Sequence, residues 1–260
     1  MVAAVALGAS LALGAACSLA IDTGGLTGGS PPDAAVGAID AGGRDVAVEA
    51  APDAAGDTRL VAEWRFDEPS GGVVEDSSGN RHHGTIGGGS RVGGRAGGTI
   101  GALKLDGNRD VVVVPASAEF DRGRDSTFTM TAWMRRDGPV SHAMFVSVSY
   151  GDKDSSFGIE LETDTTLTYW DSTTHAVESP VVVPIGTWHH YAIAVDRDRV
   201  TIYLDGNIVG AGKADRSERT STQVRLGGSS FGDHLDGALD VVRYYRVTLD
   251  AAGVLADMNR

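Results

Sequence analysis

The chain has 260 residues, of which 42% are hydrophobic and 6% aromatic, and its formal net charge is −13 at pH 7. This length and apolar content allow one substantial β domain with an appended tail, and the 36 glycines favour strands and turns over long helices. A nucleic-acid partner is excluded, because binding a phosphate backbone relies on Lys and Arg side chains to neutralise it.

Residues 1–20 have the features of an export signal. The first sixteen are uncharged and mostly Ala, Leu, Val and Gly, too few to span a bilayer but enough for the apolar part of a secretory signal. The single cysteine, Cys17, follows Leu-Gly-Ala-Ala, which resembles the lipobox of bacterial lipoproteins. The resemblance implies that Cys17 is acylated and that the protein contacts a membrane only through this lipid. Because Ser18 follows the cysteine, the resemblance also implies that the lipoprotein is sorted to the outer membrane. The alternative is a secreted protein whose signal peptide is cut near Ala16 or Ala20.

Residues 21–57 form a compositionally distinct segment of Gly, Ala, Pro, Asp and Ser that contains no aromatic residue. Seven acidic residues against one arginine give it a net charge of −6. Such a segment cannot bury enough apolar surface to offset the entropy lost on ordering, and like charges extend it. We therefore expect a disordered linker with a mean reach on the order of 30–35 Å.

The remaining residues, 58–260, carry a repeated strand pattern. Short apolar or alternating runs bounded by turn residues are typical of an antiparallel sandwich. The glycine-dense residues 84–101 predict turns and an exposed loop instead. Asp250 is placed to cap one short helix over residues 251–258. The expected strands cover residues 60–67, 102–105, 110–114, 128–135, 143–150, 156–163, 167–170, 188–195, 200–204, 224–226 and 238–247.

Residues 188–212 predict three adjacent strands. Two apolar runs flank an Asp-Arg-Asp-Arg connection, and Asp205-Gly206 then supplies a second tight turn. Tyr191 shares an apolar row with the residues two and four places along, whereas the opposite row contains Ala192 and Ala194. These small residues leave room for a neighbouring element.

The string Trp-His-His-Tyr-Ala-Ile-Ala-Val-Asp, followed by Val-Thr-Ile-Tyr-Leu-Asp-Gly-Asn-Ile-Val, resembles the signature hairpin of laminin-G-like domains in the concanavalin A-like lectin/glucanase superfamily. Residues 60–86, 102–115, 128–137 and 224–249 resemble other blocks of the family in the same order. The resemblance implies an all-β antiparallel jelly-roll sandwich over residues 58–260. It also implies an extracytoplasmic, non-catalytic module that recognises a glycan or a surface protein, and we expect a monomer.

A calcium site is a further expectation. The segment from Asp76 to Asn80 offers hard oxygen ligands in a tight loop. Laminin-G-like domains often hold one structural calcium between the opening loop and the closing strand, which would bring Asp76 and Asn80 near Asp240, with Asp67 as a further ligand. A hydrogen-bonded Asx-turn network without metal is the alternative interpretation.

Ligand-binding candidates are Tyr150, Trp170 and Asp152, since an aromatic face beside hydrogen-bonding groups suits a sugar ring. The alternative is that these aromatic residues belong to the core. Tyr169 and Trp170 are neighbours on a strand, so only one of them can face outward.

An enzyme is not predicted, although Glu160, Glu162 and Asp164 alternate along one expected strand. Consecutive carboxylates there would be about 6.5–7 Å apart, near the separation glycosidases use. The acidic strand of the superfamily's glucanases is typically Glu-x-Asp-x-x-Glu, and here its last position is Thr165. We therefore expect a solvated strand face. A structural envelope protein without a specific small ligand is the alternative function, and a glycoside hydrolase is the least favoured.

Overall fold

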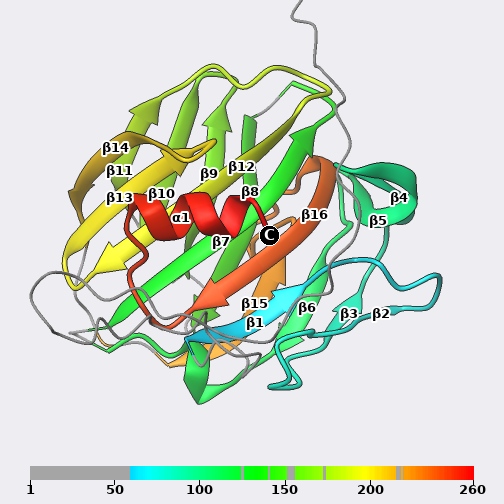
Figure 1. Cartoon of the computed structure of the whole chain (residues 1–260), viewed down its shortest axis with the longest axis horizontal. Coiled ribbons are helices and arrows are strands. Elements are labelled where there is room, and N and C mark those ends of the chain that lie inside the picture. The colour runs from blue at the N-terminus through cyan, green and yellow to red at the C-terminus, as the bar shows by residue number, and fades with distance from the viewer. Residues whose placement is uncertain are drawn as a thin grey trace, which may run out of the picture. The chain divides into compact units, whose positions relative to one another are not determined.

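The computed structural model describes residues 59–260, with the exception of residues 124–125, 140, 151–155, 172–173, 215–217 and 219. The predicted export signal with Cys17, the linker and Asp152 lie outside the described residues. Two eight-stranded antiparallel sheets, named sheet A and sheet B, form the fold (Figure 1). The predicted all-β sandwich is thus confirmed.

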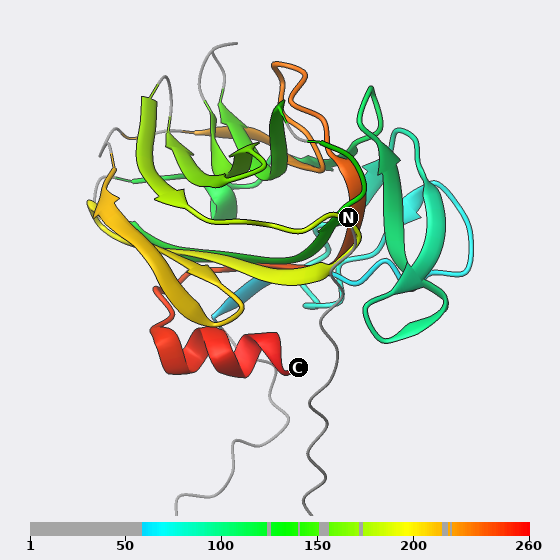
Figure 2. The same cartoon turned by 90° about the horizontal axis from the view of Figure 1, so that it is seen from above.

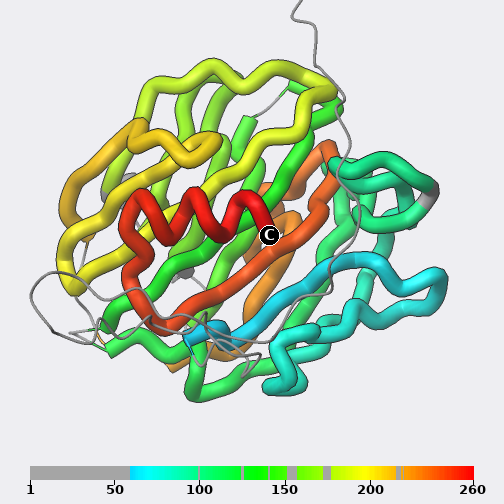
Figure 3. The backbone as a smooth tube through the Cα atoms, in the orientation of Figure 1, coloured from blue at the N-terminus to red at the C-terminus, as the bar shows by residue number. Residues whose placement is uncertain are grey.

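Sheet A contains the hairpin predicted over residues 188–204 and the first and last strands of the described domain. Its strands run in the order β14 (Asn207–Lys213), β13 (Arg199–Leu204), β12 (Trp188–Asp196), β7 (Thr127–Arg136), β16 (Asp236–Tyr245), β5 (Gly97–Asp106) and β4 (Ser90–Gly94), and β1 (Leu60–Trp64) also pairs with β16. The first and last strands of the domain therefore lie side by side (Figure 3).

Sheet B runs in the order β11 (Thr174–Pro180), β10 (Thr166–Asp171), β9 (Ser156–Thr163), β8 (Ser141–Tyr150), β15 (Ser221–Leu226), β6 (Val112–Pro115), β3 (Gly84–Ile86) and β2 (Val73–Val74). A short 3-10 helix, η1 (Ala118–Phe120), follows β6. At one side of the sandwich the two sheets close on each other, because the Ser179 hydroxyl of β11 donates to the Val209 carbonyl of β14 at 2.6 Å.

The core fills the space between the sheets. Trp64 and Phe66 are fully buried there, as their alternation predicted. The ring of Phe145 in sheet B meets that of Tyr191 in sheet A with centroids 4.9 Å apart. Burying each such side chain stabilises the fold by roughly 1.5–3 kcal/mol.

The helix α1 (Ala251–Met258) lies on the outer face of sheet A (Figure 2). Asp250 caps it as predicted, since its carboxylate accepts from the Gly253 amide at 2.8 Å. The helix packs through Val254 into a cluster that includes Ala192 and Ala194. The small residues of β12 thus provide the room for the helix that their spacing indicated.

The hairpin prediction is confirmed, whereas the loop prediction for residues 84–101 is wrong. Asp205 and Gly206 take φ values of 50° and 75°, the left-handed torsions that a tight hairpin turn needs. Most of the glycine-dense stretch is a hairpin formed by β4 and the start of β5. Glycines carry no side chain and cannot show the alternation that marks a strand, so the backbone pairing was invisible in the sequence.

Candidate functional site

A pocket of about 380 Å³ lies on the outer face of sheet B, over the central strands β8, β9 and β10. On β9, Phe157, Ile159 and Leu161 point into the core. Alternation therefore places Glu160 on the outer face. The pocket is lined by His142, Met144, Glu160, Trp170, Phe231 and Asp233.

The polar centre of this pocket is the pair His142 and Glu160. The His142 Nδ1 atom lies 2.8 Å from Glu160 Oε1, and the side chains are 48% and 3% exposed, respectively. The hydrogen bond to Glu160 raises the pKa of His142 above its usual value, and the negative charges of Asp233 and Glu162 add to this. His142 also has a φ of 61°, a left-handed conformation that is uncommon for a side-chain-bearing residue and gathers at functional sites.

The loop that carries Phe231 is held by hydrogen bonds of its own. The Ser229 hydroxyl donates to Asp233 Oδ2 at 2.6 Å and accepts from the Phe231 amide at 3.0 Å. The Asp233 carbonyl accepts from the Met144 amide at 3.0 Å, which fixes the loop to β8. Phe231 is 49% exposed and is therefore presented to solvent from an anchored loop.

Trp170 reaches the pocket from β10, where it pairs with Gly158 of β9. Its neighbour Tyr169 is fully buried in the core, so only one of the two faces outward, as predicted.

The prediction for Tyr150 is wrong. Tyr150 is 5% exposed, and its ring lies against the core residue Phe157 at a centroid distance of 5.6 Å, because its place on β8 points it between the sheets.

The three carboxylates at residues 160–164 do not form one continuous row. Glu162 accepts from the Thr168 hydroxyl at 3.3 Å on β10. Asp164 follows the end of β9, and its carboxylate lies 2.6 Å from the Arg136 guanidinium. The turn after Thr163 thus redirects the last carboxylate away from the strand face.

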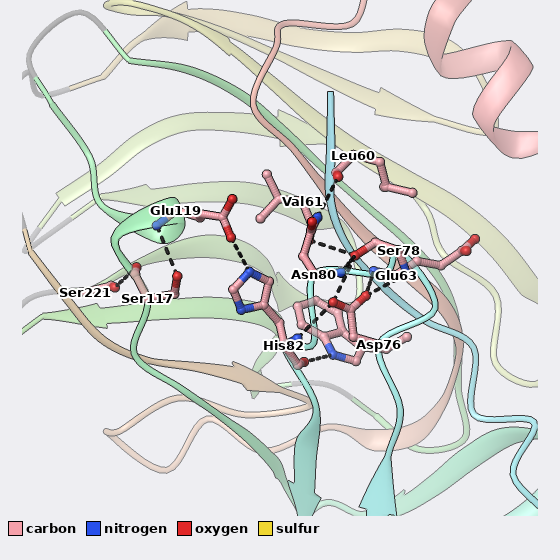
Figure 4. Close-up of polar contacts among 11 residues, drawn as sticks. Leu60, Val61, Glu63, Asp76, Ser78, Asn80, His82, Ser117, Glu119 and Ser221 are labelled. Carbon is pink, nitrogen blue, oxygen red and sulfur yellow. Dashed lines mark hydrogen bonds and ion pairs between the residues drawn. The ribbon is translucent and has the colours of Figure 1, made fainter. Parts of the chain in front are cut away.

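Asp76 is the centre of a hydrogen-bond network beside the opening strand (Figure 4). Its Oδ1 accepts from the Glu63 and Ser78 amides, and its Oδ2 accepts from the Ser78 hydroxyl and the His82 amide, each at 2.9 Å. Burial would raise the pKa of Asp76, but these hydrogen bonds outweigh burial and lower it. Asn80 donates to the carbonyls of Leu60 and Val61 at 3.2 and 2.9 Å. This is the Asx-turn network of the alternative interpretation.

The same network extends to sheet B through η1. His82 Nε2 lies 2.5 Å from Glu119 Oε2. Ser117 caps η1 by accepting from the Glu119 amide at 3.3 Å, and its carbonyl accepts from the Ser221 hydroxyl of β15 at 2.8 Å. Figure 4 shows this polar chain running from β1 to η1. Its contacts are those of a scaffold that fixes the opening loop.

The other two residues predicted for calcium lie elsewhere. Asp67 and Asp240 line a pocket of about 200 Å³ together with Arg65 and Arg95, and neither Asp76 nor Asn80 lines it. Burial raises the pKa of Asp240, and its Oδ2 accepts from the Arg95 amide at 2.8 Å.

The prediction that these four residues form one site is therefore wrong. Among the described residues, no group of three or more His, Cys, Asp or Glu side chains is placed to hold a metal ion. The oxygens of Asp76 do not fit a calcium shell, because N–H and O–H donors already point at both of them, whereas calcium needs six to eight oxygen ligands directed at the ion.

Sequence reasoning did not assign Met144, His142, Phe231 or Asp233 to a site. The available signal was Phe231, a lone aromatic residue in the polar string Gly-Gly-Ser-Ser-Phe-Gly-Asp-His.

Within the described part of the chain, no helix has both the length and the apolar content needed to cross a membrane.

Comparisons with known proteins agree with this fold. A family model described as the concanavalin A-like lectin/glucanases superfamily matches residues 106–255, more than half of the chain. No curated protein sequence matches. Domain 4 of AbnA, an extracellular arabinanase from Geobacillus stearothermophilus solved in complex with arabinotriose, superimposes with a TM-score of 0.60 at 21% identity, covering 76% of this chain and 97% of that domain.

Two further solved structures share the fold at lower identity. Trypanosoma rangeli sialidase in complex with sialic acid gives a TM-score of 0.59 at 15% identity, covering 75% of this chain and 32% of the sialidase. The binding domain of Paraclostridial Mosquitocidal Protein 1 gives 0.56 at 15% identity, covering 77% and 52%. With the family model spanning most of the sandwich and both sheets in place, the chain belongs to the laminin-G-like family of the concanavalin A-like lectin/glucanase superfamily.

Proposed function

We propose that this domain is a non-catalytic carbohydrate-binding module whose sugar stacks on Trp170 in the pocket of sheet B. The observation that carries the proposal is the lining itself: two aromatic faces, Trp170 and Phe231, beside the polar groups of His142, Glu160 and Asp233. Aromatic rings receive the apolar face of a sugar, and a few fixed polar groups set its orientation. The neighbour from AbnA, described as bound to arabinotriose, supports a sugar as the ligand.

Three features favour binding over catalysis. Glu160 is held by His142, and Glu162, two residues along β9, accepts a hydrogen bond from Thr168. The third acidic position of the glucanase pattern is occupied by Thr165. An acid/base pair needs two carboxyl groups facing one glycosidic bond, and the hydrogen bonds of this strand hold its carboxylates in other contacts.

Replacing Trp170 by Ala is expected to weaken glycan binding at least tenfold, which corresponds to about 1.4 kcal/mol. A glycan array with the full chain identifies the sugar, and calorimetric titration measures the affinity. Trp188→Ala is the matched control, because Trp188 is a partly exposed tryptophan on sheet A. Equal loss in both variants, or no glycan bound by the full chain, would contradict the proposal.

We further propose that acylated Cys17 anchors the domain to the outer membrane of the cell envelope, through the acidic linker of residues 21–57. The uncharged apolar start of the chain and the small residues before Cys17 support this. Cells fed labelled palmitate are expected to label the protein, and the Cys17→Ala variant is expected to lose the label. Labelling of both, or of neither, would indicate that Cys17 is not acylated.

A further inference from the structure

Arg225 is a partly buried arginine on the outer face of sheet B. It lies on β15 between Val224 and Leu226, which point into the core, so alternation directs its side chain outward. Burial lowers the pKa of Arg225, and no neighbouring charge offsets this effect. Among the described residues, no Asp or Glu forms an ion pair with its guanidinium. The outer face of the sheet thus carries a positive charge that the described part of the chain does not neutralise.

The guanidinium of Arg225 is held in one orientation by Gln223, which lies two residues earlier on the same face. The side-chain amide oxygen of Gln223 accepts from the Nε and Nη2 atoms of Arg225, each at 3.0 Å. Gln223 is neutral, so these hydrogen bonds orient the guanidinium without cancelling its charge. No hydrogen bond within the described residues uses the Nη1 atom. The end of the fork, formed by Nη1 and the second hydrogen of Nη2, is therefore available, and its geometry matches a carboxylate.

Arg225 lies in the same cross-strand row as Trp170. The row runs from Arg225 on β15 through Ser147 on β8 and Gly158 on β9 to Trp170 on β10. Three strand spacings separate its ends, so their Cα atoms are about 14 Å apart. The two positions between them carry small residues, and the loop after β15 leaves the sheet beside them, where the Gly228 carbonyl accepts from the Ser147 hydroxyl at 2.9 Å. This separation suits a short oligosaccharide better than a single sugar ring.

The acidic groups of the pocket lie at the Trp170 end of this arrangement. Glu160 and Asp233 both line the pocket, and Arg225 is not among the lining residues. Glu160 is paired with His142 at 2.8 Å and belongs to β9, which is separated from β15 by β8. The two ends of the row therefore differ in chemistry, with an aromatic face at one end and a positive charge at the other.

We propose that the carbohydrate site extends to Arg225 and takes an acidic oligosaccharide, with one ring stacked on Trp170 and the carboxylate of a uronic acid received by the Arg225 guanidinium. This inference rests on the proposed function and adds the ligand class to it. A carboxylate is favoured over a neutral or cationic group because a guanidinium removed from water gains most from an anionic acceptor, and Gln223 supplies only a neutral one.

The test compares acidic trisaccharides with their own methyl esters by calorimetric titration of the full chain at pH 7. Trigalacturonic acid and trimannuronic acid carry the carboxylates, and each methyl ester keeps the sugar rings but loses the charge. We expect at least one acid to bind about tenfold more tightly than its ester, as a charge-assisted hydrogen bond predicts. Raising the NaCl concentration is expected to reduce this preference, because salt screens charges.

Two variants assign the preference to Arg225. Arg225→Gln removes the charge and is expected to abolish the preference, while unchanged binding of the esters shows that the variant is folded. Arg225→Lys keeps the charge without the planar fork and is expected to retain only part of the preference. Arg199→Gln, which replaces an exposed arginine on sheet A, is the control and is expected to leave the preference unchanged.

The outcomes separate this inference from the proposed function. Equal or tighter binding of the esters, abolished by Trp170→Ala, would overturn the acidic-sugar assignment and leave the carbohydrate module intact, as would a glycan array on which the full chain binds neutral sugars alone. A preference that persists in Arg225→Gln would overturn the role of Arg225. Tighter binding of a sulfated trisaccharide than of either acid would overturn the assignment of a carboxylate. If no glycan binds at all, both proposals fail.

Discussion

Replacing Asp171 by Ala is expected to lower the free energy of unfolding by about 3–5 kcal/mol, the usual cost of removing one partner of a buried ion pair. Asp171 is fully buried and lies 2.5 Å from the Arg122 guanidinium, which is itself 3% exposed. Burial would lower the pKa of Arg122, but the neighbouring Tyr169 and Asp171 raise it above its ordinary value. Without Asp171, Arg122 would remain charged inside the core.

Thermal melting is the measurement, and a fall in Tm of roughly 10 °C is expected for a domain of this size. Asp67→Ala is the control, because Asp67 and its partner Arg65 are both more than half exposed, and a change within about 0.5 kcal/mol is expected. Combining Asp171→Leu with Arg122→Met should recover most of the lost stability. A double variant as unstable as Asp171→Ala would show that the charges themselves are not the cause.

Asp257→Asn is expected to cost about 2–3 kcal/mol at pH 6, and this cost should shrink as the solution becomes acidic. The carboxylate of Asp257 accepts from Tyr245 and Arg243 and contacts His190 at 3.1 Å, all beneath α1. Burial would raise the pKa of Asp257, but the hydrogen bond from His190, the charge of Arg243 and the hydrogen bond from Tyr245 lower it to about 2.

The sign of the pH dependence follows from that shift. The pKa of Asp257 is about 2 in the folded state against an ordinary 3.8, so the stabilisation is fully present above pH 3.8 and is lost as pH falls through about 2. Urea unfolding should therefore show the difference between the native chain and Asp257→Asn falling by about half from pH 6 to pH 3. Asp198→Asn, at the surface beside Lys213, serves as the control. A difference that stays constant over this range would contradict the assigned pKa.

Much of the architecture could be predicted because period-two alternation decides which strand residues are buried. The row of Tyr191, the turn at Asp205 and the cap at Asp250 were all local patterns, and the structure confirms each of them. Alternation also puts Tyr150 in the core, two places after Val148, so the prediction for Tyr150 was wrong because it rested on the neighbouring loop and not on this pattern.

The sequence predicted only part of the candidate site, because the contacts between its elements are not local patterns. Trp170 and Glu160 lie on neighbouring strands, and sequence patterns could place each on a face but not against each other. Phe231 and Asp233 reach the pocket from a loop, whose position depends on the Ser229 hydrogen bonds and the anchor at Met144. Contacts between residues far apart in the chain leave no periodic pattern in the sequence, so they could not be predicted and are seen only in the folded structure.

The contact between β11 and β14 has a consequence for self-association. An edge strand normally presents unpaired backbone groups on which another chain can add a strand. Here the carbonyl of Val209, at the bulge of β14, is already occupied by the Ser179 hydroxyl of β11. Gly210 and Gly212 allow this approach, since an added Cβ would lie 2.9 Å from Ser179 and 2.7 Å from Val177. Each edge on this side thus shields the other from the strand addition that leads to fibrils.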